Sequence, residues 1–192
     1  MDLHRAVLVI VDAQRGFINP HTRPVVPALV RLAREWTAAG RPLVLTRFRN
    51  PPGSPYETIT GWTRMRTADE QEVIGELAPF TEGAHLVDKT GSSAITPDFV
   101  RLAQLHGWRE LILAGLDTDA CVYDTATAAY HQGFVPWIVT DACASGGGPE
   151  YHEAALLLAR RNLGPRQLLT TTQLTVAGHA DSTVRPGTGA SA

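Results

Sequence analysis

The feature that most constrains the fold is a run of six apolar residues near the N-terminus, positions 6–11, which ends abruptly at Asp12. A continuous apolar run of this length is typical of a strand that is buried on both faces of a parallel sheet. Parallel strands need a crossover connection, which is usually a helix. The rest of the chain should therefore alternate between helices and strands.

The expected alternation continues along most of the chain. Apolar residues recur at helical spacing over positions 25–39, and Gly40 is placed to end that helix. Another helix is opened by Thr96, an N-cap residue type, and closed by Gly107. Further helices are expected at 120–131 and 149–162, and further strands at 42–48, 85–87, 110–114, 134–140 and 167–171.

This succession predicts a single α/β domain, residues 1–175, in which helices cover both faces of a six-stranded, mostly parallel sheet. We expect a three-layer α/β/α arrangement with the Rossmann-like strand order 3-2-1-4-5-6. Residues 49–62 begin with several prolines and glycines and predict a long, functional loop. Residues 176–192 are small, polar and aperiodic, and predict a flexible C-terminal tail.

Charge and composition exclude several classes of partner. A formal net charge of −2 and a pI near 6.4 give no general attraction to nucleic acid or to anionic lipid. The N-terminal region has no apolar segment long enough for a signal peptide or a membrane span, so a cytoplasmic location is expected. The chain has two cysteines, Cys121 and Cys143, which are expected to be reduced, since disulfide-stapled secreted domains normally contain more.

Three polar residues are expected at one edge of the sheet. Asp12 follows the first strand, Lys89, the only lysine, follows the third, and Cys121 lies in the turn after the fourth. Ligands of open parallel sheets bind outside the carboxyl ends of the strands, so this edge is the candidate site. Taken singly, each residue also has an ordinary structural interpretation, such as a turn-capping aspartate or an inert core cysteine.

The turn that contains Cys121 has the parts of an activated thiol. A cysteine at a helix N-terminus lies at the positive end of the helix dipole, which favours the thiolate. The N–H groups of the same turn can hold the oxyanion that forms when sulfur attacks a carbonyl. No histidine follows an expected strand, so Asp12 is the better candidate for the base and Lys89 for its counter-charge.

Taken together, these segments resemble the isochorismatase-like cysteine hydrolases, which include nicotinamidases and N-carbamoylsarcosine amidohydrolases. The resemblance runs from Val7 to about Leu174. Its landmarks are Val-Ile-Val-Asp-Ala-Gln-Arg-Gly-Phe at 9–17, Asp-Lys at 88–89 with Ser-Ala at 93–94, Gly-Leu-Asp-Thr-Asp-Ala-Cys-Val at 115–122, and Asp-Ala at 141–142.

This resemblance implies a catalytic triad of Cys121, Asp12 and Lys89. It also implies a cis peptide between Leu116 and Asp117, with the backbone N–H groups of Asp117 and Cys121 forming the oxyanion hole. Metal-dependent members carry histidines that this chain lacks between His21 and His85, so no metal and no other cofactor is expected. Because enol-ether-cleaving members commonly lack the cysteine, the resemblance favours cleavage of an amide C–N bond through a thioester.

The resemblance and the composition of the long loop suggest how a small-molecule substrate is held. We expect the substrate pocket to be bordered by Gln14, Phe17, Arg47, Tyr56 and Trp62. An arginine that faces inward there, including those at 49, 64 and 66, would favour a substrate with a carboxylate. Self-association into a dimer or tetramer is expected from the resemblance alone.

Other functions remain open at this point. One alternative is enol-ether hydrolysis of isochorismate, with Asp12 as general acid and Cys121 as a bystander. A second is a non-catalytic protein that binds a small ligand, because fold alone does not fix function. A redox pair of Cys121 and Cys143 is disfavoured because a strand separates them, and Cys143 is interpreted as structural.

Overall fold

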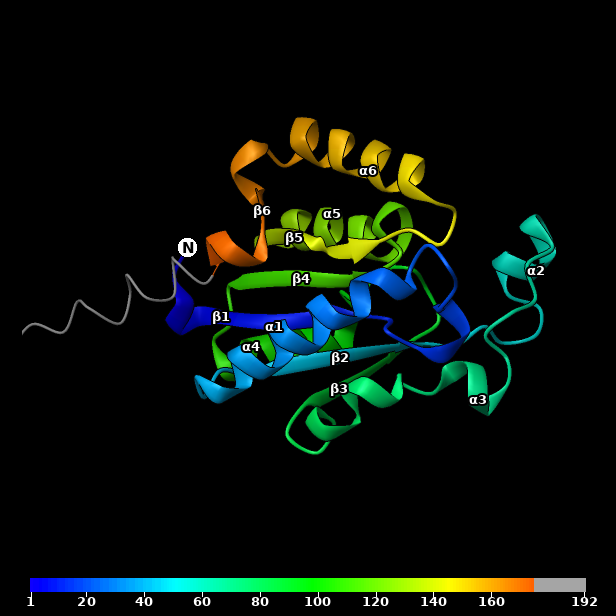
Figure 1. The fold of residues 1–192 in the computed structure, drawn as a ribbon, viewed down its shortest axis with the longest axis horizontal. Coiled ribbons are helices and arrows are strands. Elements are labelled where there is room, and N and C mark those ends of the chain that lie inside the picture. The colour runs from blue at the N-terminus through cyan, green and yellow to red at the C-terminus, as the bar shows by residue number, and fades with distance from the viewer. Residues whose placement is uncertain (175–192) are drawn as a thin grey trace, which may run out of the picture.

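The protein is a three-layer α/β/α domain, seen in a computed structural model that describes residues 1–174 (Figure 1). The predicted tail, 176–192, lies outside the described residues. The strands are β1 (Ala6–Val11), β2 (Leu43–Phe48), β3 (His85–Lys89), β4 (Glu110–Leu116), β5 (Val135–Ala144) and β6 (Leu168–Leu169). The helices are α1 (Val26–Ala38), α2 (Pro55–Thr60), α3 (Ala68–Gln71), α4 (Pro97–His106), α5 (Tyr123–His131) and α6 (Pro149–Asn162).

The six strands form one parallel sheet in the order β3-β2-β1-β4-β5-β6, which confirms the predicted topology. All six residues of β1 are buried, because the strand lies in the middle of the sheet between β2 and β4. Its alternate side chains enter two separate hydrophobic cores, one on each face of the sheet. The continuous apolar run is thus explained by burial on both faces.

Different helices build the two cores. On one face, α1 contributes Leu29 and Trp36. On the other face, α4 contributes Phe99, α5 contributes Ala126 and α6 contributes Ala159. Both faces of the sheet are therefore covered, so a polar ligand can bind only at the edges of the sheet or at the ends of its strands. No helix within residues 1–174 combines the length and apolar character needed to cross a membrane.

The segment 49–62, expected to be a long loop, contains the short helix α2, and a second short helix, α3, follows it. Ser54 caps the N-terminus of α2 by accepting a hydrogen bond from the backbone N–H of Glu57. Thr67 and Glu70 form a reciprocal capping box at α3. These helices are 6 and 4 residues long, too short for a periodic apolar pattern to reveal them. In Figure 1 α2 projects beyond the carboxyl ends of the central strands.

The strands β4 and β5 are longer than expected at their carboxyl ends. Strand β5 continues to Ala144, so Cys143 lies within it and pairs in register with Gly115 of β4. Gly115 has a φ of +120°, and a Cβ atom there would lie 2.1 Å from the carbonyl oxygen of Val11. Only glycine permits this approach of β4 to β1, which brings the turn after β4 close to Asp12.

Candidate active site

Asp12 and Lys89 meet beneath the turn that carries Cys121. Asp12 directly follows β1, and Lys89 is the last residue of β3, two strands away in the sheet. Lys89 Nζ lies 2.6 Å from Asp12 Oδ2, and both side chains are fully buried. Cys121 is also buried, with 8% of its surface exposed, at the floor of a cavity. The structure therefore brings together the three residues predicted for the triad.

The Asp12 carboxylate is held in one orientation by β2. The hydroxyl of Thr46 donates to Asp12 Oδ1 at 2.6 Å and accepts a hydrogen bond from the Asp12 backbone N–H at 3.0 Å. Asp12 has a φ of +47°, a left-handed conformation that is uncommon for residues other than glycine. Such conformations cluster at functional sites, where the surroundings hold them in place. Oδ2 accepts no well-aligned hydrogen bond from the residues at 1–174.

Lys89 is surrounded by acceptors. Its Nζ donates to the carbonyl oxygens of Gly91 at 3.1 Å and Ser92 at 2.7 Å, in addition to its ion pair with Asp12. Burial by itself would lower the pKa of Lys89, but the negative charge of Asp12 and the neighbouring Cys121 outweigh it, so the pKa is raised. Lys89 is therefore an ammonium throughout the neutral pH range.

The Cys121 thiol lies close enough to Asp12 and Lys89 for the charges of both residues to shift its pKa. Its pKa is nevertheless raised well above the ordinary value, first by burial and then by the negative charge of Asp12, while Lys89 acts in the opposite direction. This corrects the expectation that the helix N-terminus makes the thiolate the favoured form. In the free protein the site holds a neutral thiol next to an ion pair.

The turn from Asp117 to Cys121 is a π-helical turn, Thr118–Val122, that leads directly into α5. The peptide bond between Leu116 and Asp117 is cis, as the resemblance implied. The carbonyl oxygen of Cys121 accepts a hydrogen bond from the Thr125 hydroxyl at 2.6 Å, which anchors the turn to α5. Asp117 and Cys121 border the same cavity, so their backbone N–H groups are candidates for binding one oxygen.

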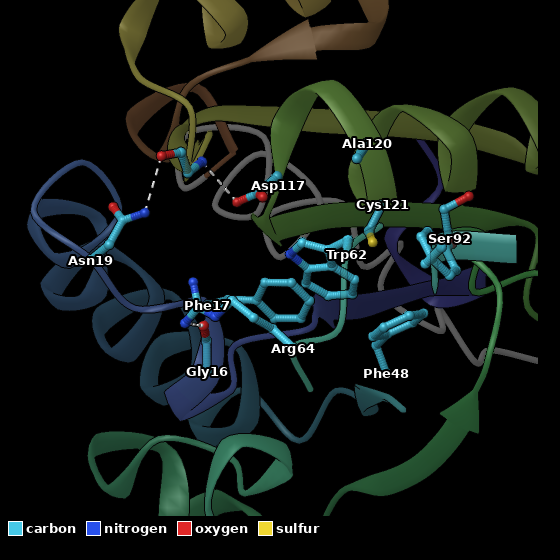
Figure 2. Close-up of a pocket in the computed structure, with 12 residues that line it drawn as sticks. Gly16, Phe17, Asn19, Phe48, Trp62, Arg64, Ser92, Asp117, Ala120 and Cys121 are labelled. Atoms are coloured by element: carbon cyan, nitrogen blue, oxygen red, sulfur yellow. Dashed lines mark hydrogen bonds between the residues drawn. The ribbon is translucent and has the colours of Figure 1, made fainter. Parts of the chain in front are cut away.

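The cavity above Cys121 has a volume of about 290 Å³ (Figure 2). Four aromatic rings line it: Phe17 and Trp62 are stacked with centroids 6.2 Å apart, and Phe48 and Tyr56 meet edge to face at 5.1 Å. The remaining lining residues are small or polar, and they are Gly16, Asn19, Arg64, Ser92, Asp117, Ala120 and Gly146. The cavity therefore suits a small substrate that has both apolar surface and polar groups.

Of the five residues predicted to bind the substrate, the structure places three at the cavity: Phe17, Tyr56 and Trp62. The prediction was wrong for the position of Gln14 and Arg47. The Gln14 amide hydrogen-bonds both backbone groups of Phe48, at 2.8 and 3.0 Å, and so braces β2. Arg47 instead forms an ion pair with Asp88 at 2.7 Å. Successive side chains of a strand point to opposite faces of the sheet, so Arg47 points to the opposite face from the residues before and after it in β2.

Several cavity residues were missed or left open by the sequence. Arg64 is the arginine that faces the cavity, and its Nη2 donates to the carbonyl oxygen of Gly16. Asn19 and Gly146 come from two loops joined by a hydrogen bond from Asn19 Nδ2 to the Gly146 carbonyl oxygen, and no periodic pattern in the sequence marks them. Thr46, the hydrogen-bond partner of Asp12, was also missed, although a polar residue in a buried strand indicates a buried hydrogen-bond partner.

The cysteine Cys143 lies outside this cavity. It is buried in β5, its sulfur is 3.9 Å from the carbonyl oxygen of Leu113, and burial raises its pKa to about 12. Within residues 1–174 no three His, Cys, Asp or Glu side chains are grouped so that they could hold a metal ion.

Comparison with known proteins agrees with this geometry. The family model described as the isochorismatase domain matches residues 6–173. A probable isochorismatase of Pseudomonas chlororaphis is 30% identical over 168 residues, which cover 81% of this chain and 79% of that protein.

Solved structures agree as well. An N-carbamoylsarcosine amidase from Thermoplasma acidophilum superimposes with a TM-score of 0.75 at 25% identity, over 86% of this chain and 95% of that one. A nicotinamidase from Bacillus subtilis gives a TM-score of 0.76 at 25% identity, over 86% and 99% of the two chains. The chain therefore belongs to the isochorismatase-like family of hydrolases.

Proposed function

We propose that this protein is a cysteine-dependent amidohydrolase that cleaves the C–N bond of a small amide through a thioester on Cys121. The observation that carries the proposal is the buried ion pair of Asp12 and Lys89 close to a thiol that lines an open cavity. Burying two charges costs free energy unless good geometry and additional hydrogen bonds offset the loss of solvation. The likeness to an N-carbamoylsarcosine amidase and to a nicotinamidase supports cleavage of a C–N bond.

The proposed reaction begins with a proton transfer that accompanies the attack. Asp12 takes the proton of the Cys121 thiol as sulfur bonds to the carbonyl carbon, and the carbonyl π electrons move to oxygen. The N–H groups of Asp117 and Cys121 hold that oxygen. Asp12 then gives the proton to the amide nitrogen, the C–N bond breaks, and the amine leaves. Water, deprotonated by Asp12, hydrolyses the thioester and restores the thiol.

The raised pKa of Cys121 determines the order of these events. Because the resting thiol is neutral, the thiolate forms only when a carbonyl is present to accept it. Before attack the site holds an aspartate, an ammonium and a neutral thiol, and after proton transfer it holds a neutral acid, an ammonium and a developing thiolate. The net charge does not change, and Lys89 stabilises whichever neighbour is negative.

The cavity also suggests a feature of the substrate. Arg64 takes the role proposed for an inward-facing arginine, and its guanidinium favours a substrate with a carboxylate. Comparing hydrolysis of paired acidic and neutral amides by wild type and Arg64→Ala tests this idea. A preference for the acidic amide that falls about tenfold or more in the variant supports it, and equal losses on both amides remove it.

A second candidate function is enol-ether hydrolysis, which the likeness to a probable isochorismatase favours. In that reaction Asp12 would protonate the substrate as a general acid and Cys121 would not form a bond. The two functions differ in their need for sulfur. Turnover that survives both Cys121→Ala and alkylation of the thiol supports the enol-ether reaction.

The decisive experiment is a screen of small amides against wild-type protein with mass spectrometry of the intact chain and of its peptides. An acyl adduct on Cys121, together with release of the amine, supports the proposal. Asp12→Asn should prevent formation of the adduct, and Cys143→Ala should not. Substantial turnover by Cys121→Ala would contradict the proposed mechanism.

A further inference from the structure

The side chain of Asp117 presents an unused carboxylate oxygen at the substrate cavity. Asp117 lies at the start of the turn that carries Cys121, and both residues line the same cavity. Its Oδ1 accepts a hydrogen bond from the backbone N–H of Gly146 at 2.9 Å. Its Oδ2 accepts no hydrogen bond from any donor in the described part of the chain. A partly buried carboxylate with a free oxygen has the chemistry to bind a donor on a ligand.

Three segments fix the position of this carboxylate. The Gly146 peptide joins Asp117 to Asn19, whose Nδ2 donates to the Gly146 carbonyl oxygen at 3.0 Å (Figure 2). Asn19 Oδ1 is itself used, because it accepts from the backbone N–H groups of His21 and Thr22. The side-chain oxygen of Asn19 is therefore already used, whereas Asp117 Oδ2 can accept a hydrogen bond from the substrate.

The space beside Asp117 Oδ2 is preserved by a glycine. A Cβ atom on Gly146 would lie 3.2 Å from Asp117 Oδ2 and 3.2 Å from Asn19 Nδ2, closer than side chains normally pack. In Figure 2 this polar end, with Asn19, Asp117 and Arg64, lies on the other side of the Phe17 and Trp62 rings from Ser92. Asp117 and Cys121 both line this cavity, so the polar end and the nucleophile belong to one pocket.

Within residues 1–174 no basic side chain forms an ion pair with Asp117. The pKa of Asp117 is raised to about 6, mainly by burial and also by the charges of Asp119 and Asp12, while the hydrogen bond from Gly146 and the charge of Arg64 act in the opposite direction. Arg64 does not pair with Asp117 within 4 Å in the structure of residues 1–174; it lies 3.9 Å from Glu70. Asp117 and Arg64 therefore line one cavity with opposite charges but do not form an ion pair with each other. A ligand with an ammonium would supply both the missing donor and the missing charge.

We infer that Asp117 is a specificity-determining residue that binds an ammonium group of the substrate. Together with Arg64 it selects amides with a zwitterionic, amino-acid-like head, in which the ammonium contacts Asp117 and the carboxylate contacts Arg64. This inference rests on the proposed function, which assigns the amide carbonyl to Cys121. It adds the class of substrate and assigns a role to the Asp117 side chain in addition to its backbone N–H.

The test compares amides that differ by a single amino group. Binding of glutamine and of glutaramate, its analogue without the α-amino group, is measured by calorimetry at pH 7.5 on the full chain carrying Cys121→Ala. Asparagine and succinamate form a shorter pair. In one of the two pairs the amino compound should bind at least about tenfold more tightly, because a charge-assisted hydrogen bond is formed.

Variants assign that preference to the carboxylate. Asp117→Asn keeps an oxygen for the Gly146 N–H and removes the charge, so the preference for the amino compound should disappear. Asp119→Asn is the matched control, since Asp119 is exposed, lies two residues away and loses the same charge. It should retain the preference, and thermal unfolding verifies that both variants are folded.

Three results overturn the inference: equal affinity for the two members of each pair, an unchanged preference in Asp117→Asn, or no binding of any of the four amides. Failure of the proposed function is seen separately. If wild-type protein binds the amino compounds selectively but forms no adduct and releases no ammonia, the chemistry assigned to Cys121 is wrong while the specificity of Asp117 stands.

Discussion

The two cysteines of this chain are both buried, one in the turn after β4 and one in the neighbouring strand β5, and they differ in their surroundings. Cys121 follows β4 and Cys143 lies in β5, and burial is the largest cause of the raised pKa of each thiol. Cys143 contacts backbone groups of β4, with its sulfur 3.9 Å from the carbonyl oxygen of Leu113, whereas Cys121 lies near Asp12 and Lys89 and lines the cavity. Burial alone makes a thiol inert, and an adjacent base, a counter-charge and access to a carbonyl are what distinguish Cys121.

Removing each sulfur in turn is the strongest test of this difference. Cys121→Ala should lower turnover of any amide that wild type hydrolyses by about 10⁴-fold or more, because the nucleophile is lost. Cys143→Ala should retain turnover within about threefold, since this residue does not line the cavity. Steady-state assays of the two variants decide the matter. Similar losses in both would mean that the two thiols act together.

Changes at Lys89 test whether a counter-charge separates the two environments. Lys89→Met leaves Asp12 as an uncompensated buried charge and should lower the free energy of unfolding by about 3–5 kcal/mol as well as abolish turnover. Lys89→Arg keeps the charge but should lower turnover about 10²-fold or more, because a planar fork does not fit three acceptors around one nitrogen. Denaturant unfolding and kinetics measure both effects, and full activity of Lys89→Arg would contradict this account.

The strand ends of the site could be predicted from the sequence, and most of the cavity wall could not. Asp12 directly follows β1 and Lys89 ends β3, and the parallel order of the strands brings their carboxyl ends to one edge of the sheet, so recognising the strands is enough to bring these residues together. Arg64, Asn19 and Gly146 belong to loops that the tertiary fold positions, and no spacing marks them. The expected roles of Gln14 and Arg47 failed because backbone bracing and strand alternation direct these side chains elsewhere.

The balance at Cys121 could not be predicted either. The sequence indicated a helix N-terminus, which favours the thiolate, but it contains no measure of how deeply the sulfur is buried or how close Asp12 lies. These two effects together exceed the influence of Lys89 and keep the thiol neutral. The depth of burial and the distances to the charged neighbours therefore decide whether the pKa of Cys121 is raised or lowered, even though the sequence identified all three residues.

Alkylation of the native protein measures how accessible the two thiols are. Iodoacetamide should modify Cys121 at least about 100-fold faster than Cys143, because only Cys121 faces the cavity, while the Cys143 thiol with a pKa of about 12 is buried in the sheet. Unfolding in denaturant should make the two rates similar. Peptide mapping by mass spectrometry distinguishes the sites, and rapid native labelling of Cys143 would contradict the assignment.

The smallest expected effect is on stability. Cys143→Ala removes a buried sulfur from β5 and should lower the free energy of unfolding by about 1 kcal/mol. Chemical denaturation of the reduced protein gives this value. A loss above about 4 kcal/mol would assign Cys143 a larger structural role than packing.

The central claim is that Asp12 and Cys121 share one proton, with Asp12 holding the thiol neutral until substrate is present. The most direct measurement is the pH midpoint for alkylation of Cys121, in a Cys143→Ala background, with Asp12 and with Asp12→Asn. Because the charge of Asp12 raises the pKa of the thiol, its removal leaves Lys89 as the nearest charge. We predict a lower midpoint and faster alkylation at pH 7.5 in Asp12→Asn, accompanied by loss of turnover. An unchanged or higher midpoint would contradict the account.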